Sequence, residues 1–551
     1  MTDEEHLMVT SRLPILSDRQ GFDRRWYANN LKRVFAPTSA AEVAVAWKEV
    51  IALGGRAGDL QITCGRHCYE NFVYNHETKF IIDLTGLRGI GCDANHGYFI
   101  DVGYGNWEMY RMFNNMFDTT LPAGSCYSVG LGGHITGGGY GLLSRAFGLT
   151  VDYLSAVDVV MIPKGASVPE LYEKISPVNH PDIFWAVCGG GGGNFGIITR
   201  YYFQNTPKAP QYMYTAAFSF DWKDTGGNLL ITEEVMSQLL ELFTKFSEDG
   251  QDGDKSKWPS FGIFHANHLA AGQMVFASYY FDAPSLGVKG KEYESYLTDK
   301  LREQRRSLSE ITKLSVQPGP INGHPWHGTT HSITPVNSSS ELRHFTFLEG
   351  VQNANGSGPN QFGKYKSAYM KKGFTSDMVA ALHEHLQRVP DGLSLSDMRQ
   401  SLCQIDSYGC AINQVGSSDT PIAQRSSIMK LQYQTYWDSD TAIGQDDVQS
   451  EHAHVTWIND MYSAVYAKYG GYPDPRNDPD DIVDGCYFNY PDCSLGVNGQ
   501  SSPGIANAMY LYFLQNYDSG PQDRNLRAIK SNWNPHNWFA SAQSIPVDGS
   551  L

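Results

Sequence analysis

The sequence has no apolar run that approaches the ~18 residues needed for a membrane-spanning helix. Positive charge is also scarce, because 42 Lys and Arg stand against 58 Asp and Glu and leave a net charge of −16. No basic stripe interrupts this acidic balance. A general electrostatic attraction to nucleic acid or to anionic lipid is therefore excluded, and we expect neither a nucleic-acid partner nor a membrane partner.

Paired cysteine motifs are missing as well. The nine cysteines form no CxxC pair and no zinc-ligand spacing, so we expect no structural metal. Their number is odd, which leaves at least one of them free or otherwise occupied, and any pairing of the others is open. The acidic N-terminus lacks the basic and apolar regions of a secretory signal. We expect a cytoplasmic protein, unless a leader has been removed.

The length of 551 residues predicts two or more domains, and 41% apolar with 18% charged residues is an ordinary globular balance. Hydrophobic periodicity predicts helices at residues 106–118, 232–246 and 290–311. Two strands are predicted in residues 149–163, and a strand, a loop and a strand in 412–437. This mixed order of elements is typical of an α+β protein with an antiparallel sheet in its middle part.

Glycine is concentrated in residues 122–148, where seven of the twelve residues from Gly130 to Gly141 are glycine. The spacing does not match a GxGxxG fingerprint with an acidic ribose partner, which argues against a nicotinamide site. Backbone that lies against a phosphate or a flat ring is the better interpretation, and a glycine-rich loop without a ligand is the alternative. A second run, Gly189 to Gly193, is flanked by Trp185 and Phe195 and is read as a turn rather than a flexible linker.

Two motifs follow one another at a distance of 59 residues (126 − 67): His67 in CGRHCYE and Cys126 in AGSCYSVGLGG. Taken singly, a turn histidine that forms hydrogen bonds and a small packed cysteine would explain them. Together with GGGGGNFG, GCYFNYPD and NWNPHNWFASAQSI, however, they resemble the flavin oxidases related to berberine bridge enzyme, in the vanillyl-alcohol-oxidase class. The resemblance implies a two-domain α+β fold of the PCMH type. Residues 1–205 and 476–551 would form the FAD-binding domain, and residues 206–475 the substrate domain.

The same resemblance implies FAD bound through two covalent bonds, from His67 to the flavin C8α methyl group and from Cys126 to flavin C6. Family members commonly have two glycines before the histidine, whereas this chain has Gly65 and then Arg66, whose side chain must contact the pyrophosphate or point away from it. Further cofactor contacts are expected from Gly65, Arg66, Cys68, Tyr69, Val129, Gly132, Gly133, Gly137, Gly138, Asn194, Gly196, Ile198, Tyr487 and Asn489.

Tyr487 in CYFNYPD matches the tyrosine of the family's YxN motif and is the expected general base. A phenol with an unperturbed pKa near ~10 is a poor base at neutral pH, so neighbouring tyrosines or a basic group must stabilise its phenolate. Tyr140 and Tyr69 are candidates on the flavin side, and Tyr408 on the side of the substrate domain. Each of these could instead be a core aromatic residue, since the chain has 32 tyrosines.

The resemblance implies oxidation of an alcohol by a flavin, with dioxygen reduced to hydrogen peroxide. A tyrosine base favours a sugar, or a hydroxylated or glycosylated natural product, over the N-methyl amine of the family's namesake. The partners are then a small-molecule substrate and O2, while the oligomeric state is open. A flavin dehydrogenase with another acceptor, an oxidative cyclisation of an alkaloid or polyketide, and a glycine-rich binding protein without activity are the alternatives.

Overall fold

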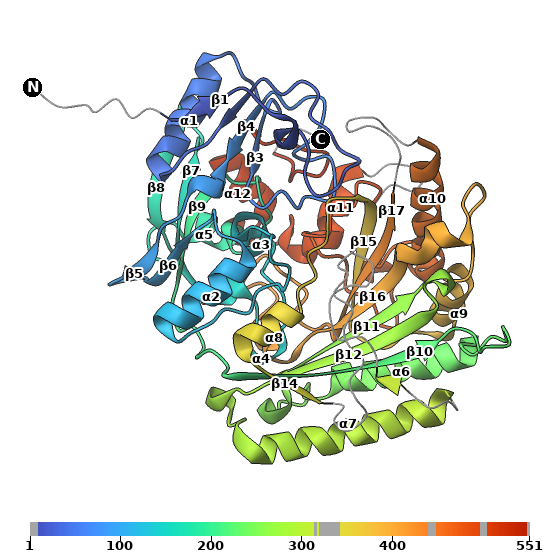
Figure 1. The fold of residues 1–551 in the computed structure, drawn as a ribbon. Coiled ribbons are helices and arrows are strands. Elements are labelled where there is room, and N and C mark those ends of the chain that lie inside the picture. Colours follow the sequence, from blue (N-terminus) through green and yellow to red (C-terminus); the bar gives the residue numbers. More distant parts are fainter. Residues whose placement is uncertain (1–8, 313–316, 319–341, 439–447, 496–503, 548–551) are drawn as a thin grey trace, which may run out of the picture.

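The computed structural model describes residues 9–312, 317–318, 342–438, 448–495 and 504–547, and Figure 1 shows their arrangement. The acidic residues 1–8, part of the N-terminal segment interpreted above, lie outside the described residues. The described residues form three β-sheets, two of them built from the N-terminal part of the chain and one from its middle part. Across the described ranges, no helix is long and apolar enough to cross a lipid bilayer.

The first sheet has four strands in the order β1-β2-β4-β3. β2 and β3 both pair with β4 in parallel, whereas β1 pairs with β2 antiparallel. The apolar run in β4 is buried along its whole length, as expected for a central strand covered on both faces. The bounds of the four strands are β1 Ser11–Arg12, β2 Arg33–Phe35, β3 Leu60–Thr63 and β4 Phe80–Asp83.

The second sheet has five strands in the order β5-β6-β9-β7-β8, and all its pairs are antiparallel. β7 and β9 form its buried centre, where Val, Ile and Tyr side chains fill the core. The bounds of the five strands are β5 Ile90–Asp93, β6 Gly97–Asp101, β7 Leu154–Met161, β8 Glu170–Ile175 and β9 Ile197–Phe203.

The third sheet has eight strands, which run in the order β13-β10-β12-β11-β16-β17-β15, with β14 also paired to β10. Every pair is antiparallel, which confirms the antiparallel sheet predicted for the middle of the chain. The bounds are β10 Tyr212–Asp221, β11 Ser260–Asn267, β12 Gln273–Phe281, β13 Gln317–Pro318, β14 Arg343–Thr346, β15 Phe362–Met370, β16 Ser401–Ser407 and β17 Met429–Trp437.

Helices cover these sheets, and α6, α7 and α10 pack against the eight-stranded sheet (Figure 1). The three helices predicted from periodicity are confirmed as α2, α6 and α7. α6 begins where the Thr232 side chain accepts a hydrogen bond from the backbone N–H of Val235. The bounds are α1 Ala40–Ala52, α2 Asn106–Phe117, α3 Leu131–Thr136, α4 Ser144–Phe147, α5 Pro181–Val187, α6 Glu233–Glu248, α7 Gly290–Thr312, α8 Phe347–Asn353, α9 Ser376–His385, α10 Val448–Val465, α11 Gly504–Phe513 and α12 Leu526–Trp533.

Two strand predictions were wrong because local turns replace the expected strands. Thr150–Tyr153 is a 3-10 helix, at whose start the Asp152 carboxylate accepts the backbone N–H of Leu149 at 2.8 Å. Likewise, Cys410–Gln414 is a 3-10 helix whose first residue, Cys410, has a left-handed backbone. Of the two strands predicted in residues 412–437, only the second exists, as β17. In both segments, a local side-chain hydrogen bond or a left-handed residue favours a 3-10 turn, although the β-branched and aromatic composition predicted a strand.

The C-terminal segment packs against the N-terminal part of the chain. In Figure 1 the red C-terminal helices lie beside the blue and teal N-terminal elements, and α12 packs against α5. The side chain of Asn194, in the turn between α5 and β9, accepts a hydrogen bond from the backbone N–H of Ile545 at 3.0 Å. Residues from the two ends of the sequence therefore meet in one part of the fold.

Candidate active site

A cavity of about 400 Å³ lies where the glycine-rich stretches face the eight-stranded sheet. Its volume falls in the range of small-molecule and cofactor sites. Most of the residues predicted to form the site line this cavity, whereas Gly137, Gly138 and Tyr408 do not. The residues that line it are Gly65, Arg66, His67, Cys68, Tyr69, Cys126, Val129, Gly132, Gly133, Tyr140, Asn194, Gly196, Ile198, Tyr487 and Asn489.

Two glycines allow the histidine loop and the cysteine loop to cross in contact. A Cβ atom on Gly65 would overlap the backbone nitrogen of Gly130, and one on Gly130 would overlap the Cys64 sulfur. Beyond this crossing the chain enters α3, where a Cβ on Gly133 would meet no atom within 4 Å. The glycines thus bring two loops together and leave bare backbone along the cavity, which fits a flat or phosphate-bearing cofactor.

His67 and Cys126 both line the cavity, and a hydrogen bond joins the two loops that carry them. The Ser128 hydroxyl, two residues after Cys126, is hydrogen-bonded to His67 Nε2 at 2.8 Å. Phe22 stacks on the imidazole with ring centroids 4.7 Å apart. Burial lowers the pKa of His67 to about 4, so the imidazole is neutral and can act as a nucleophile at neutral pH.

Burial also raises the pKa of the Cys126 thiol to about 11, although the Gly356 N–H and the Lys430 ammonium act in the opposite direction. The backbone carbonyl of Cys126 accepts a hydrogen bond from the Asn106 amide at 3.3 Å. All nine cysteines fall inside the described ranges, and each is a free thiol. Cys126 is therefore available for a bond to a cofactor.

Arg66 stands where a second glycine was expected, and its backbone is left-handed with φ of 62°. Its guanidinium donates to the Asp83 carboxylate at 2.6 Å and to the Ser17 carbonyl at 2.7 Å. The positive charge of Arg66 is therefore paired with the Asp83 carboxylate next to the cavity. Cys68, two residues after Arg66, donates its S–H to the Glu70 carbonyl at 3.3 Å.

The run of glycines before Asn194 is a turn, as predicted, between α5 and β9. The Asn194 amide donates to the Gly190 carbonyl at 3.0 Å and closes the turn. Gly196 has a φ of +151°, and a Cβ there would lie 2.7 Å from the Val160 carbonyl oxygen. The turn therefore needs glycine for its own geometry and presents backbone to the cavity.

Tyr487 lies in the cavity wall with its hydroxyl held by Asn489, whose amide nitrogen is 3.3 Å away. The same amide donates to the His134 carbonyl at 2.9 Å. A Cβ on Gly137 would overlap the Asn489 side chain, so Gly137 lies against Asn489 although it does not line the cavity. Burial raises the pKa of Tyr487, and Lys430, Asn489 and the backbone of Tyr140 act against this rise.

Lys430, on β17, is a candidate site residue that the sequence analysis missed. Its fully buried ammonium lies 3.1 Å from Asp406 Oδ2 and donates to the Tyr490 hydroxyl at 3.0 Å. It also lies 5.3 Å from the centroid of the Tyr487 ring and 4.5 Å from that of Tyr140. The alternation of polar residues in KLQYQTY could have revealed this face of the strand.

Of the other predicted tyrosines, Tyr140 and Tyr69 line the cavity and Tyr408 does not. The Tyr140 hydroxyl donates to the Ser407 carbonyl at 2.7 Å. The backbone of Tyr140 acts to lower the pKa of Tyr487. Tyr408 is fully buried with its ring 5.2 Å from Tyr140, behind the cavity wall. Tyr69 stacks on Tyr365 at 3.6 Å and lines the cavity.

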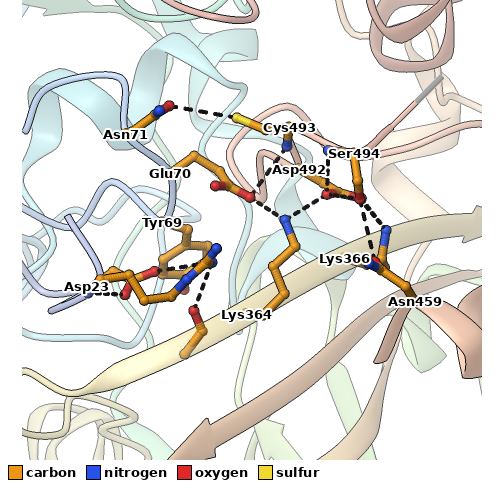
Figure 2. A network of polar contacts seen from close by, with 12 residues as sticks. Asp23, Tyr69, Glu70, Asn71, Lys364, Lys366, Asn459, Asp492, Cys493 and Ser494 are labelled. Atoms are coloured by element: carbon orange, nitrogen blue, oxygen red, sulfur yellow. Dashed lines mark hydrogen bonds and ion pairs between the residues drawn. The ribbon is translucent and has the colours of Figure 1, made fainter. Parts of the chain in front are cut away.

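A buried ionic cluster joins three parts of the chain next to this site (Figure 2). Lys364 on β15 is paired with Glu70, three residues after His67, and with Asp492 at 2.7 Å, two residues after Tyr490. Lys366 donates to Asp492 at 2.6 Å. Although burial favours the neutral acid, the two lysines hold the pKa of Asp492 well below its ordinary value. We refer to Glu70, Lys364, Lys366 and Asp492 as the ionic clamp.

Comparison with known proteins identifies similar flavin-dependent oxidoreductases. Residues 31–168 match a family model described as an FAD binding domain, and residues 486–546 match one described as berberine and berberine like. The chain is 36% identical to hexose oxidase from Chondrus crispus, over 97% of this chain and 93% of that protein. It is 28% identical to aclacinomycin-N/aclacinomycin-A oxidase from Streptomyces galilaeus, over 94% of this chain and 85% of that protein.

Among solved structures, a glycopeptide hexose oxidase complexed with teicoplanin superposes with a TM-score of 0.78. It is 26% identical in sequence, and the match covers 98% of this chain and 99% of that one. The expected fold, an α+β PCMH-type FAD-binding fold, is confirmed by this likeness together with the family models.

Proposed function

Because the chain belongs to the berberine bridge enzyme-like family of FAD-dependent oxidoreductases, we propose that it oxidises an alcohol carried by a sugar or a hydroxylated or glycosylated natural product. The observation that carries this proposal is the position of Tyr487, a buried phenol beside a buried ammonium in the wall of a cavity built on bare glycine backbone. The names of the two similar oxidases, for a hexose and for an aclacinomycin, agree with this substrate class.

FAD, when bound, supplies the acceptor for the hydride of the carbinol C–H bond, and dioxygen takes these electrons to give hydrogen peroxide. We propose that His67 and Cys126 hold the cofactor by two covalent bonds, through an imidazole nitrogen and a sulfur. The neutral imidazole of His67, the free thiol of Cys126 and the Ser128 contact between their loops support this arrangement.

The protein's own residues handle the proton. In this proposal Tyr487 Oη receives the proton of the substrate hydroxyl as the carbinol carbon is oxidised to a carbonyl. Lys430 favours the phenolate of Tyr487 electrostatically, and Asn489 fixes the position of the phenol oxygen. Removal of a positioned base typically lowers a rate by ~10²–10⁴.

The test is anaerobic reduction of the bound flavin by substrate, followed by absorbance. Tyr487→Phe keeps the ring and the spectrum of the bound flavin but should bleach ~10²–10⁴ times more slowly. Tyr212→Phe, an exposed tyrosine on β10, is the matched control and should bleach like the native protein. Bleaching of Tyr487→Phe at the native rate would remove Tyr487 from this role. Bleaching without peroxide on return to air would indicate a dehydrogenase.

We also propose that residues 1–205 and 476–551 form the FAD-binding domain and residues 206–475 the substrate domain. The two N-terminal sheets end at β9, and the eight-stranded sheet begins at β10, which supports a boundary near residue 205. The hydrogen bond between Asn194 and Ile545 supports the return of the C-terminal segment to the first domain.

A further inference from the structure

The segment that follows α8, residues 354–357, lies against the loop that carries Cys126. α8 belongs to the middle part of the chain, yet it packs against the N-terminal helix α2 (Figure 1). The rings of Phe347 on α8 and Tyr110 on α2 meet edge to face, with centroids 6.0 Å apart. The helix ends just before the segment, and three of the four residues of the segment line the cavity. We refer to residues 354–357 as the α8 loop.

Hydrogen bonds fix the α8 loop on the backbone of the cysteine loop. Asn355 Oδ1 accepts the backbone N–H of Tyr127 at 3.2 Å and that of Ser357 at 2.9 Å. The Ser357 hydroxyl accepts the backbone N–H of Ser128 at 3.3 Å. Two successive N–H groups after Cys126 are therefore held by side chains that lie 228 and 229 residues further along the chain.

The α8 loop also reaches His67, through the hydroxyl of Ser128. Ser128 Oγ donates to Ser357 Oγ at 3.2 Å and lies 2.8 Å from His67 Nε2. A serine hydroxyl has a single hydrogen, so Ser128 accepts from the Nε2–H group while it donates to Ser357. The hydrogen bonds then run in one direction, from His67 to Ser128 to Ser357. They select the tautomer that carries its proton on Nε2 and its lone pair on Nδ1.

Gly356, between the two side chains that hold the cysteine loop, acts on the thiol itself. Burial raises the pKa of Cys126, and the Gly356 N–H and the Lys430 ammonium act against this rise. The thiolate rather than the thiol forms bonds, and an N–H donor stabilises the negative charge of the sulfur. One short segment thus contacts the loops of both candidate attachment residues.

We propose that the α8 loop is a positioning element for covalent attachment of the cofactor. In this role Ser357 acts on His67 through Ser128, and Gly356 acts on Cys126. The inference rests on the proposed attachment of FAD at these two residues. Because the α8 loop comes from the middle part of the chain, attachment requires this part to be folded against the N-terminal part.

Each attachment step removes one hydrogen from the protein and one from the flavin. At His67 a C–N bond replaces an imidazole N–H bond and a C–H bond of the methyl group. At Cys126 a C–S bond replaces the S–H bond and the C6–H bond. In each step dioxygen takes the two hydrogens and becomes hydrogen peroxide. The proton of His67 leaves from Nε2, where Ser128 accepts it.

The experiment follows bond formation itself. Full-length protein is purified without flavin from a host starved of riboflavin, FAD is added in air, and samples are stopped with acid and digested. Mass spectrometry gives the fraction of the His67 peptide and of the Cys126 peptide that carries flavin at each time. Ser357→Ala should form the His67 bond roughly 10- to 100-fold more slowly, because a hydrogen bond that supports an ionising group is lost.

Rescue and binding separate this role from a merely structural one. Ser357→Thr keeps the hydroxyl and should restore the rate. Ser285→Ala, at an exposed serine before α7, is the matched control and should react at the native rate. Non-covalent binding of FAD, measured by quenching of flavin fluorescence before the bonds form, should be unchanged in Ser357→Ala. Weaker binding of FAD by Ser357→Ala, with no recovery in Ser357→Thr, would overturn the inference.

A double variant tests the path through Ser128. Ser128→Ala combined with Ser357→Ala should form the His67 bond no more slowly than Ser128→Ala alone, because one relay is broken in both. Two effects that multiply would contradict the relay.

Where Ser357→Ala does not fold, Asn355 decides. Asn355→Ala loses the acceptor of two N–H groups and should slow both bonds, whereas Asn355→Asp keeps an acceptor and should slow them less. Both bonds forming at the native rate in Asn355→Ala would overturn the inference while covalent attachment stands. If the native protein forms neither bond, the proposed attachment fails and this inference fails with it.

Discussion

The replacement Lys364→Met removes the central cation of the ionic clamp and should destabilise the whole protein. The Lys364 side chain is 4% exposed, and those of Glu70 and Asp492 are 2% and 3% exposed, so no solvent is available to replace the lost charge. Asp492 keeps Lys366, but Glu70 loses its cation. Removal of one partner from a buried ion pair typically costs ~3–5 kcal/mol.

With an unfolding entropy of ~2.1 cal/mol/K per residue over the 551 residues of the chain, this cost corresponds to a fall in Tm of about 3–4 °C. Thermal unfolding followed by far-UV circular dichroism would measure it. Glu70→Gln combined with Lys364→Met removes both charges and keeps an acceptor for the Cys493 N–H, so at least half of the loss should be recovered.

Lys468→Met is the matched control, because its pair with Asp480 is about half exposed, at 50% and 52%. Exposed pairs contribute only ~0.2–1 kcal/mol, and its Tm should move by less than about 1 °C. A Lys364→Met protein that melts like this control would refute the reasoning. So would a double variant that melts lower than Lys364→Met alone. Because Glu70 lies three residues after His67, Lys364→Met should also reduce the fraction of protein that carries bound flavin.

Three further predictions concern the site itself. Gly137→Ala would place a Cβ on the Asn489 side chain and should slow flavin bleaching and lower Tm; Asn489→Ala in the same protein should recover Tm but not the rate. Burial lowers the pKa of His134 to about 4, below its ordinary 6.5, so the unfolded chain binds the proton more tightly and Tm should fall as pH drops from 6.5 to 4. His134→Gln should flatten this fall, and an unchanged slope would contradict it. Lys430→Met should raise the pKa of Tyr487 and shift the rising limb of kcat/KM to higher pH; a limb that stays in place would exclude the electrostatic role.

Local sequence signals predicted much of this fold. α2 and α6 followed from helical periodicity, and the turn at Asn194 followed from a glycine run between two apolar segments. The predictions failed where a short-range cap or a left-handed residue decided the backbone, as at Asp152 and Cys410. Such turns depend on one side chain or one dihedral angle, so the amino-acid composition of the segment does not predict them.

For the candidate site, motifs indicated His67, Cys126 and Tyr487, and the structure brings these three to one cavity. Lys430 was missed because its pair with Asp406 joins β17 to β16, and no single segment of the sequence reveals this contact. The Tyr140 hydroxyl also has a partner that no motif reveals, the Ser407 carbonyl, which lies far along the chain. Side-chain partners at long sequence separation are set by the tertiary fold.

The attachment of the cofactor tests the central claim most directly. The purified holoprotein is denatured in acid, digested and analysed by mass spectrometry and by absorbance. The account predicts one species in which the peptide of His67 and the peptide of Cys126 are joined through a single flavin. His67→Ala and Cys126→Ala should each retain flavin on the remaining residue alone. Unmodified peptides of both residues, with all FAD released on denaturation, would contradict the account.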